Sequence, residues 1–249
     1  MAKEKYGRYE LKYFLPMNRA KELINQVEMH IQPDPHAEIC EGLPKYCIQS
    51  VYLDTEDLKL YYEKIDGLRD RRKFRIRAYC RPDTDTPVFF EIKYRYNRQV
   101  MKDRAMFSLD DTLCLLENEK RLDEMDLPLH VRKPTERFCH YFNLMNLTPI
   151  VTVKYDRIPF IGKIDKQVRL TVDTNLMFID HRGNRRLFEP NVEEAVPLPG
   201  AILEMKFDKL MPEWMRGILR SFDIRQQSIS KYAYCVEGAV FNKYEQIVA

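Results

Sequence analysis

The sequence of 249 residues has no apolar run of membrane-spanning length, and its first ten residues contain no signal peptide. Its 8 glycines leave little material for a glycine-rich nucleotide loop, and no such loop occurs. The net charge of +3 argues against a protein that coats nucleic acid indiscriminately, so any basic function must come from local clustering. We therefore expect a globular, cytoplasmic protein that neither inserts directly into a membrane nor takes nucleic acid as its partner.

Metal-binding and disulfide patterns are also missing. The six cysteines include no Cys-x-x-Cys pair, so we expect neither a zinc site nor a disulfide framework, and we interpret them as reduced thiols. The five histidines lack the spacing of metal ligands. The cysteines are Cys40, Cys47, Cys80, Cys114, Cys139 and Cys235.

The most informative stretch of the chain alternates basic and apolar residues. Because successive side chains of a β-strand leave opposite faces, Lys73, Arg75 and Arg77 share one face. Phe74 and Ile76 share the other face. Three neighbouring cations repel one another, so their face requires either water or a polyanion.

Similar alternation recurs along the chain, together with stretches of helical periodicity. Asn18 is the expected cap of the first helix, and Pro134 is expected in the first turn of the fourth. We expect strands near residues 8–13, 46–54, 71–79, 88–96, 100–109, 149–160, 167–174 and 201–208. We expect helices near residues 17–31, 56–65, 110–120, 133–145, 214–222 and 230–241.

The charged faces of these strands suggest an enclosed channel. A single charged face is most simply the wet side of a sheet. Here, however, lysines and arginines recur at every second position with only single glutamates between them, at Glu10, Glu91 and Glu204. The opposite faces are apolar, and amphipathic helices are available to cover them. We therefore predict an α+β fold, a closed antiparallel β-barrel (tunnel) of about eight strands with helices packed outside, as a single domain over residues 1–249.

A cationic lumen would focus a positive potential that suits a nucleoside triphosphate or a linear polyphosphate. The isolated glutamates would then be candidate ligands for a hard divalent cation. For Glu10 and Glu91, pairing with a cation across the barrel is the alternative. Asp54 and Asp173 could orient arginines or end their strands. A loop with Arg182, Arg185 and Arg186 is either an anion funnel or a solvated surface.

Eight motifs, occurring in order between Arg8 and Cys235, resemble those of a known family. The family is the catalytic domain of the vacuolar transporter chaperone (VTC) complex, a polyphosphate polymerase in the CYTH-like triphosphate tunnel metalloenzyme superfamily. The motifs are Arg8–Tyr13, Ser50–Thr55, Lys73–Arg77, Glu91–Lys93, Tyr155–Arg157, Arg169–Thr174, Glu204–Lys206 and Ser230–Tyr232.

The resemblance implies a set of site residues, with Arg104 as an alternative to Lys102. It implies a Mn2+ or Mg2+ ligand at Glu204, to which we add Glu10. The implied phosphate-binding residues, with Lys206 and Ser230 added from the matching motifs, are Lys12, Arg75, Arg77, Lys93, Lys102, Tyr155, Arg157, Arg169, Lys206, Ser230 and Lys231. Those expected to act in catalysis are Lys12, Arg75, Arg77, Lys93, Arg157 and Arg169.

The implied reaction is metal-dependent transfer of the γ-phosphate of ATP onto a growing polyphosphate chain, with ATP and polyphosphate as partners and a membrane-protein partner left open. Hydrolysis in the same tunnel and non-catalytic polyphosphate binding are the alternatives. Hydrolase branches of the superfamily open with Glu-x-Glu-x-Lys, and Arg8 replaces their first glutamate, which disfavours a two-metal hydrolase. A lysine typical of the family before its final Ser-Lys is missing from residues 226–229.

Overall fold

The computed structural model describes residues 8–79, 86–97, 99–117, 122, 125–182, 187–188 and 192–241. In this part of the chain, eleven antiparallel strands form one sheet. Three short strands, β2 (Ile31–Pro33), β3 (Glu38–Cys40) and β10 (Glu194–Ala195), pair at its margins with β8, β4 and β9. The main path runs in the order β1 (Tyr9–Leu15), β11 (Ala201–Phe207), β9 (Arg169–Asp180), β8 (Thr148–Gly162), β4 (Leu43–Asp54), β5 (Asp70–Tyr79), β6 (Val88–Tyr96) and β7 (Gln99–Phe107).

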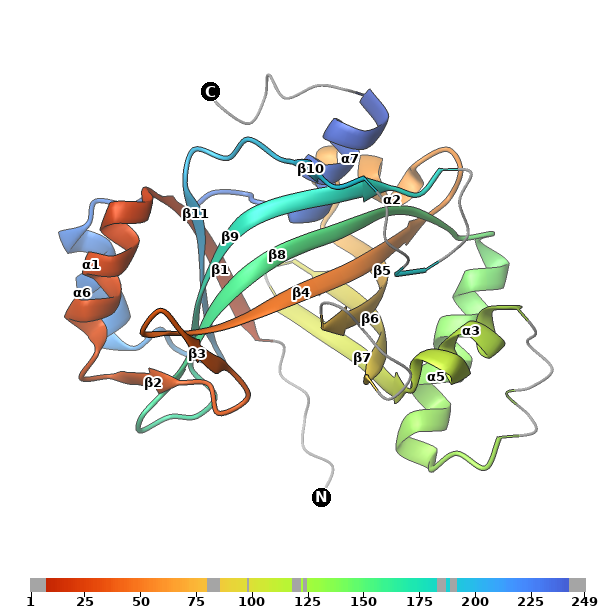
Figure 1. The fold of residues 1–249 in the computed structure, drawn as a ribbon, viewed down its shortest axis with the longest axis horizontal. Helices are drawn as coiled ribbons and strands as arrows, with labels where there is room; N and C mark the ends of the chain where they lie inside the picture. The colour runs from red at the N-terminus through yellow and green to blue at the C-terminus, as the bar shows by residue number, and fades with distance from the viewer. Residues whose placement is uncertain are drawn as a thin grey trace.

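The sheet is not closed, so the predicted closed barrel is wrong. Closure requires a ladder of hydrogen bonds between the first and last strands of the path, β1 and β7. Among the described residues, one isolated bridge joins these two edges, where the backbone N–H groups of Arg8 and Val100 each donate to the other's carbonyl at 3.2 Å. Figure 1 shows the sheet curling until the two edges approach each other. The α+β class and an antiparallel main path of eight strands are as expected.

Six helices flank the sheet in the described part of the chain. Figure 1 places α1 and α6 together on one side of the molecule, α3 and α5 on the opposite side, and α2 close to α7. Each pair covers an apolar area of the sheet. The helices are α1 (Met17–Val27), α2 (Lys59–Ile65), α3 (Leu109–Glu117), α5 (Leu129–Leu144), α6 (Glu213–Ser221) and α7 (Lys231–Phe241). No helix of the described residues is both long and apolar enough to span a membrane.

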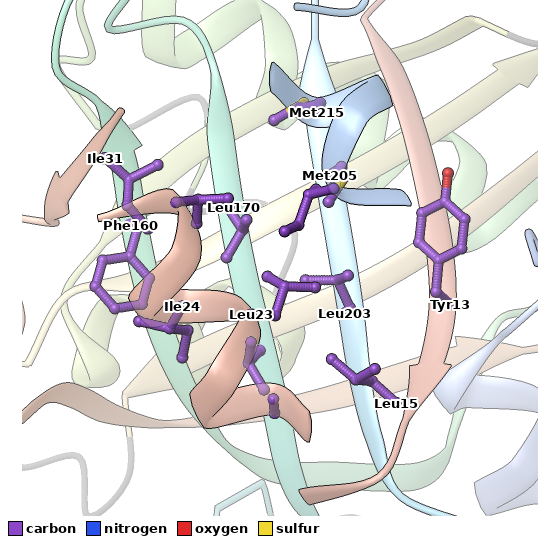
Figure 2. Close-up of a cluster of buried hydrophobic side chains, with 14 of the residues drawn as sticks. Tyr13, Leu15, Leu23, Ile24, Ile31, Phe160, Leu170, Leu203, Met205 and Met215 are labelled. Carbon is purple, nitrogen blue, oxygen red and sulfur yellow. The ribbon is translucent and has the colours of Figure 1, made fainter. Parts of the chain in front are cut away.

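The apolar cluster under α1 and α6 shows how strand alternation sorts the side chains (Figure 2). Leu23 of α1 and Met215 of α6 pack against Leu203 and Met205 of β11, and all four are fully buried. Tyr13 of β1 joins the same cluster. The residues between these apolar positions therefore point to the other face of the sheet.

The opposite end of the sheet is packed in the same way. Phe138 of α5 stacks on Phe90 of β6 with ring centroids 4.7 Å apart, and its ring meets Phe74 of β5 edge-on. Because Phe74 faces this cluster, the basic residues beside it on β5 face away from the helices.

One expected helix cap and one expected helix start are wrong, whereas the first helix begins at Met17 as expected. The first helix is preceded by Pro16, whose φ of −53° already suits a helix, and no side chain caps it, so Asn18 is not its cap. The helix expected to begin near Pro134 begins at Leu129 after Pro128, which leaves Pro134 inside α5. In both cases a proline immediately before the helix sets its start.

The expectation of six reduced thiols is also wrong. Cys40, Cys114 and Cys235 are free, whereas Cys47 is disulfide-bonded, and Cys80 lies outside the described residues. The spacing of cysteines along the chain does not reveal which ones the folded strands bring together.

Replacing Leu203 by alanine tests the packing under α1. The side chain is fully buried, so Leu203→Ala should lower the free energy of unfolding by roughly 2–5 kcal/mol in urea denaturation. The matched control is Leu210→Ala, because Leu210 is 83% exposed and should change stability by no more than about 0.5 kcal/mol. Equal effects of the two substitutions would contradict this assignment of the core.

Candidate functional site

The charged face of the sheet encloses a cavity of about 520 Å3. All eleven expected phosphate-binding residues and both expected metal ligands line it, drawn from seven strands and from α7 with the segment before it. In particular, Arg75, Arg157 and Arg169 share this one cavity. The arrangement brings together side chains that lie more than 200 residues apart in the sequence, such as Lys12 and Lys231.

Glu204 of β11 lies at the centre of the charged network and is buried. Its carboxylate is within ion-pair distance of four cations, the nearest being Lys206 at 2.7 Å and Lys231 at 2.8 Å. Lys12 lies at 3.2 Å and Arg157 at 3.3 Å. Burial alone would raise the pKa of Glu204, but these cations hold the pKa well below its usual range, so the group is an anion at neutral pH.

Glu10 is the second acidic group that faces the cavity. It lies 2.8 Å from Lys93 and 3.4 Å from Lys12, which it shares with Glu204. Burial opposes ionisation, but the lysines keep the pKa of Glu10 well below its ordinary value. Two ionised carboxylates joined by one lysine offer the hard oxygen donors that Mg2+ and Mn2+ prefer, so these residues fit a divalent ion. No cluster of three acidic, His or Cys ligands exists among the described residues.

Glu91 of β6 pairs with cations, as one interpretation predicts, but its partners lie on the adjacent strands β5 and β7 and not across the sheet. Its fully buried carboxylate lies 2.6 Å from Arg75 and 3.0 Å from Arg104, with Lys102 at 3.6 Å and Arg77 at 3.7 Å. Although burial raises the pKa of a carboxyl group, these four cations lower the pKa of Glu91 overall. The cross-strand register places Arg75, Glu91 and Arg104 side by side on β5, β6 and β7.

Asp173 and Asp54, whose roles the sequence left open, differ in the groups that they bind. Asp173 of β9 accepts two hydrogen bonds from Arg157, both at 2.7 Å, and lies 2.5 Å from Lys231, so it orients cavity cations. Asp54 of β4 accepts the backbone N–H groups of Leu60 and Tyr61 at the start of α2, each at 2.9 Å. It also accepts the hydroxyl of Tyr232 at 2.5 Å, and so links α2 to α7.

Sequence reasoning did not assign Lys73 to the site, although it lines the cavity. Its Nζ donates to Ser230 Oγ at 2.7 Å and lies 5.4 Å from the ring centroid of Tyr232. The period of two that placed Arg75 and Arg77 in the cavity also places Lys73 there. Asp34, which pairs with Arg169 at 2.6 Å, follows the short strand β2 and carried no recognisable sequence pattern.

Arg182, the first arginine of the arginine-rich loop, does not support the interpretation of that loop as an anion funnel. Arg182 is held by Asp180 at 2.6 Å and by the carbonyl of Ala239 at 2.6 Å, and it does not line the cavity. Arg185 and Arg186 lie outside the described residues.

The cavity holds far more positive than negative charge. Among the described residues, twelve lysines and arginines line it, against three carboxylates, and the buried Glu91 and Asp173 behind them do not restore balance. Enclosed cations in excess attract a polyanion, and arginine and lysine together provide the forks and point charges that phosphate oxygens accept.

Comparison with known proteins identifies the family. A model of the VTC domain matches residues 7–240. The chain belongs to the VTC domain family. The resemblance carried by the eight sequence motifs is thereby confirmed.

A curated relative and two solved structures are among the known proteins similar to this chain. Vacuolar transporter chaperone complex subunit 4 of Schizosaccharomyces pombe is 21% identical over 287 residues, which cover 98% of this chain but 38% of that protein. The putative adenylyl cyclase HpAC1 from Hippeastrum, described as having a dominant triphosphatase activity, has a TM-score of 0.52 at 14% identity and covers 94% of this chain and 97% of its own. PH1819 protein from Pyrococcus horikoshii OT3 has a TM-score of 0.46 at 12% identity, and the match covers 92% of this chain and 98% of that protein. The likeness to HpAC1 concerns the fold alone.

The protonation of Lys102 provides a test of the cavity's electrostatics. Burial and the neighbouring Arg104 and Arg77 lower the pKa of Lys102 from 10.5 to about 8 in the absence of ligand. Lys102 is thus largely neutral above pH 8, and a bound anion favours its charged form, so binding of inorganic triphosphate at pH 9 should take up a proton there. Calorimetry in buffers of different ionisation enthalpy should show up to about one proton less for Lys102→Gln. Unchanged proton uptake would contradict the assignment.

Proposed function

We propose that this protein is a polyphosphate polymerase, which transfers the γ-phosphate of ATP onto inorganic polyphosphate in a metal-dependent reaction. The observation that carries the proposal is the cation-lined cavity around the ionised Glu204. Membership of the VTC domain family supports it, as does the likeness to a subunit of a vacuolar transporter chaperone complex.

The cavity residues act in this proposal by binding and by charge neutralisation. The terminal oxygen of the acceptor chain attacks the γ-phosphorus of ATP, the bond from that phosphorus to the bridging oxygen breaks, and ADP leaves with the electron pair. The attacking oxygen is already an anion, so no general base is required. Arg75, Arg157 and Arg169 hold phosphate oxygens, while Lys12 and Lys231 offset the charge that builds up during transfer.

Glu204 and Glu10 are the proposed ligands of Mn2+ or Mg2+. An ion held there would supply positive charge that offsets part of the negative charge of the bound phosphates. Lys12 contacts both carboxylates and sets their separation. Arg157 and Lys206 hold one oxygen of Glu204, while Lys12 and Lys231 hold the other, which fixes the direction in which the carboxylate presents its lone pairs.

We further propose that the protein delivers its product through a membrane-protein partner. The S. pombe relative, a subunit of a transporter chaperone complex, supports this partner, although the chain spans 38% of its length.

Triphosphate hydrolysis is the second candidate reaction. The position that carries the first glutamate in hydrolases is Arg8 here, and its guanidinium is engaged by Asp208 at 3.1 Å and by the carbonyl of Gln167 at 2.8 Å. This position therefore supplies no carboxylate for a second metal ion, which favours the polymerase.

Purified protein with ATP, Mn2+ and a short polyphosphate primer should produce acid-insoluble phosphate polymer. Release of inorganic phosphate without polymer would instead establish a hydrolase. Binding that persists in EDTA and weakens steadily with salt, with neither product formed, would establish a non-catalytic polyphosphate-binding module.

Glu204→Gln should reduce polymer formation by about 100-fold or more, because the ion and the four cations lose their shared anion. Circular dichroism checks that the variant is folded. Glu213→Gln is the control, since the side chain of Glu213 on α6 is 79% exposed and outside the cavity, and it should retain full activity. Full activity of Glu204→Gln would exclude the proposed metal site.

A further inference from the structure

A second cavity of about 230 Å3 adjoins the first. The two share Glu10, Lys12, Lys73 and Lys93 in their linings, so they are neighbouring parts of one charged space. Glu10 is the one carboxylate among the described residues that line the second cavity. Its lining cations are Lys12, Lys64, Arg71, Lys73, Lys93 and Arg95.

The strands β5 and β6 place like charges directly opposite one another in this second cavity. In the cross-strand register Arg71 faces Arg95 and Lys73 faces Lys93. Like charges at opposed positions destabilise a sheet. Two residues further along β5, Arg75 faces Glu91, so the strand pair carries its own counter-charge at that position, whereas among the four opposed cations Lys93 alone has a carboxylate partner in the described residues, Glu10 of β1 at 2.8 Å.

The other three opposed cations have neutral hydrogen-bond partners, which for Lys73 is Ser230. Arg71 donates to the carbonyl of Leu68 at 2.6 Å, and Arg95 donates to the carbonyl of Asn97 at 2.8 Å. Within the described residues, no carboxylate lies within 4.0 Å of Arg71, Lys73 or Arg95. Burial and the neighbouring Arg95 lower the pKa of Arg71, although Glu63 opposes this, and burial and four neighbouring cations lower the pKa of Lys73 well below its usual value, so a bound anion would favour the charged forms.

The remaining lining of the second cavity suits phosphate better than a nucleotide base. Polar side chains are supplied by Gln226, Gln227 and Ser228, which precede α7, and the backbone N–H of Gln227 is fixed by the carbonyl of Lys12 at 2.9 Å. Among the described lining residues there is no aromatic side chain on which a base could stack. The ligand with matching chemistry is therefore a linear anion with phosphate groups alone.

We propose that this second cavity is an anion subsite that holds the phosphate units of a long polyphosphate chain beyond those bound in the main cavity. Arg71 and Arg95 form its outer contact, and Lys73, which lines both cavities, joins the two. The inference rests on the proposed function for the identity of the chain, but its binding step requires no turnover. The subsite makes affinity depend on chain length, since inorganic triphosphate is accommodated by the main cavity and a longer chain reaches both.

The test compares two anions and two variants. The double variant Arg71→Gln, Arg95→Gln removes the outer contact, and Arg216→Gln on α6, whose side chain is 51% exposed, is the matched surface control. Dissociation constants for inorganic triphosphate and for long-chain polyphosphate are measured by calorimetry in EDTA at fixed ionic strength. The double variant should bind long-chain polyphosphate about tenfold or more weakly, as expected for lost charged hydrogen bonds, and triphosphate less than about threefold more weakly. The control should match the wild type with both.

Two results would overturn the inference. One is an equal loss of affinity for both anions, which means that the arginines act only through the general field. The other is a wild-type protein that binds long chains no more tightly than triphosphate. Misfolding is distinguishable, because removing opposed like charges should leave the melting temperature of the ligand-free double variant unchanged or raised. If the wild type makes no polymer yet shows the chain-length effect, the proposed function fails and the subsite stands.

Discussion

The structure depends on the repulsion among cations that a curled sheet brings into one enclosed space. In the part of the chain that the structure describes, twelve lysines and arginines line the main cavity, and burial deprives them of much of the screening that water supplies. Three buried carboxylates, Glu91, Asp173 and Glu204, each hold two or more of these cations. They offset part of the repulsion and fix the side chains, and the remainder is left for an anionic ligand. The protein's own carboxylates therefore leave part of the positive charge of the main cavity unneutralised.

Helix packing and cavity chemistry are joined at the start of α7. Asp54 binds the first turn of α2 and the hydroxyl of Tyr232, while the ring of Tyr232 stacks on Tyr52 with centroids 4.9 Å apart. Tyr52 in turn accepts a hydrogen bond from Arg75 at 3.1 Å. The residue before Tyr232 is Lys231, which reaches Glu204 and Asp173. A change in the packing of α7 on the sheet would therefore move cavity cations, although the helix itself lies over the apolar face (Figure 1).

Much of the site could be predicted from sequence because strand alternation is strict. Because successive side chains alternate between the two faces of a strand, burial of Phe74 and Ile76 under the helices places Arg75 and Arg77 on the cavity face. The same alternation places Lys12, between Leu11 and Tyr13, on that face. Closure of the barrel could not be predicted, because it depends on whether β1 and β7 form a ladder, and neither strand's own pattern records that pairing. Asp34 and the roles of Asp54 were equally inaccessible, since their partners are brought to them by the folded chain and not by local spacing.

The excess positive charge of the main cavity faces inward, where it can bind a single phosphate-bearing ligand. A crystal structure of the protein with inorganic triphosphate would test this directly. We expect phosphate groups inside the main cavity, in contact with Arg75, Arg157 and Arg169, and next to Lys231. Triphosphate bound only on the helix-covered outer face, with the cavity empty, would show that the inward-facing cations are not the binding site.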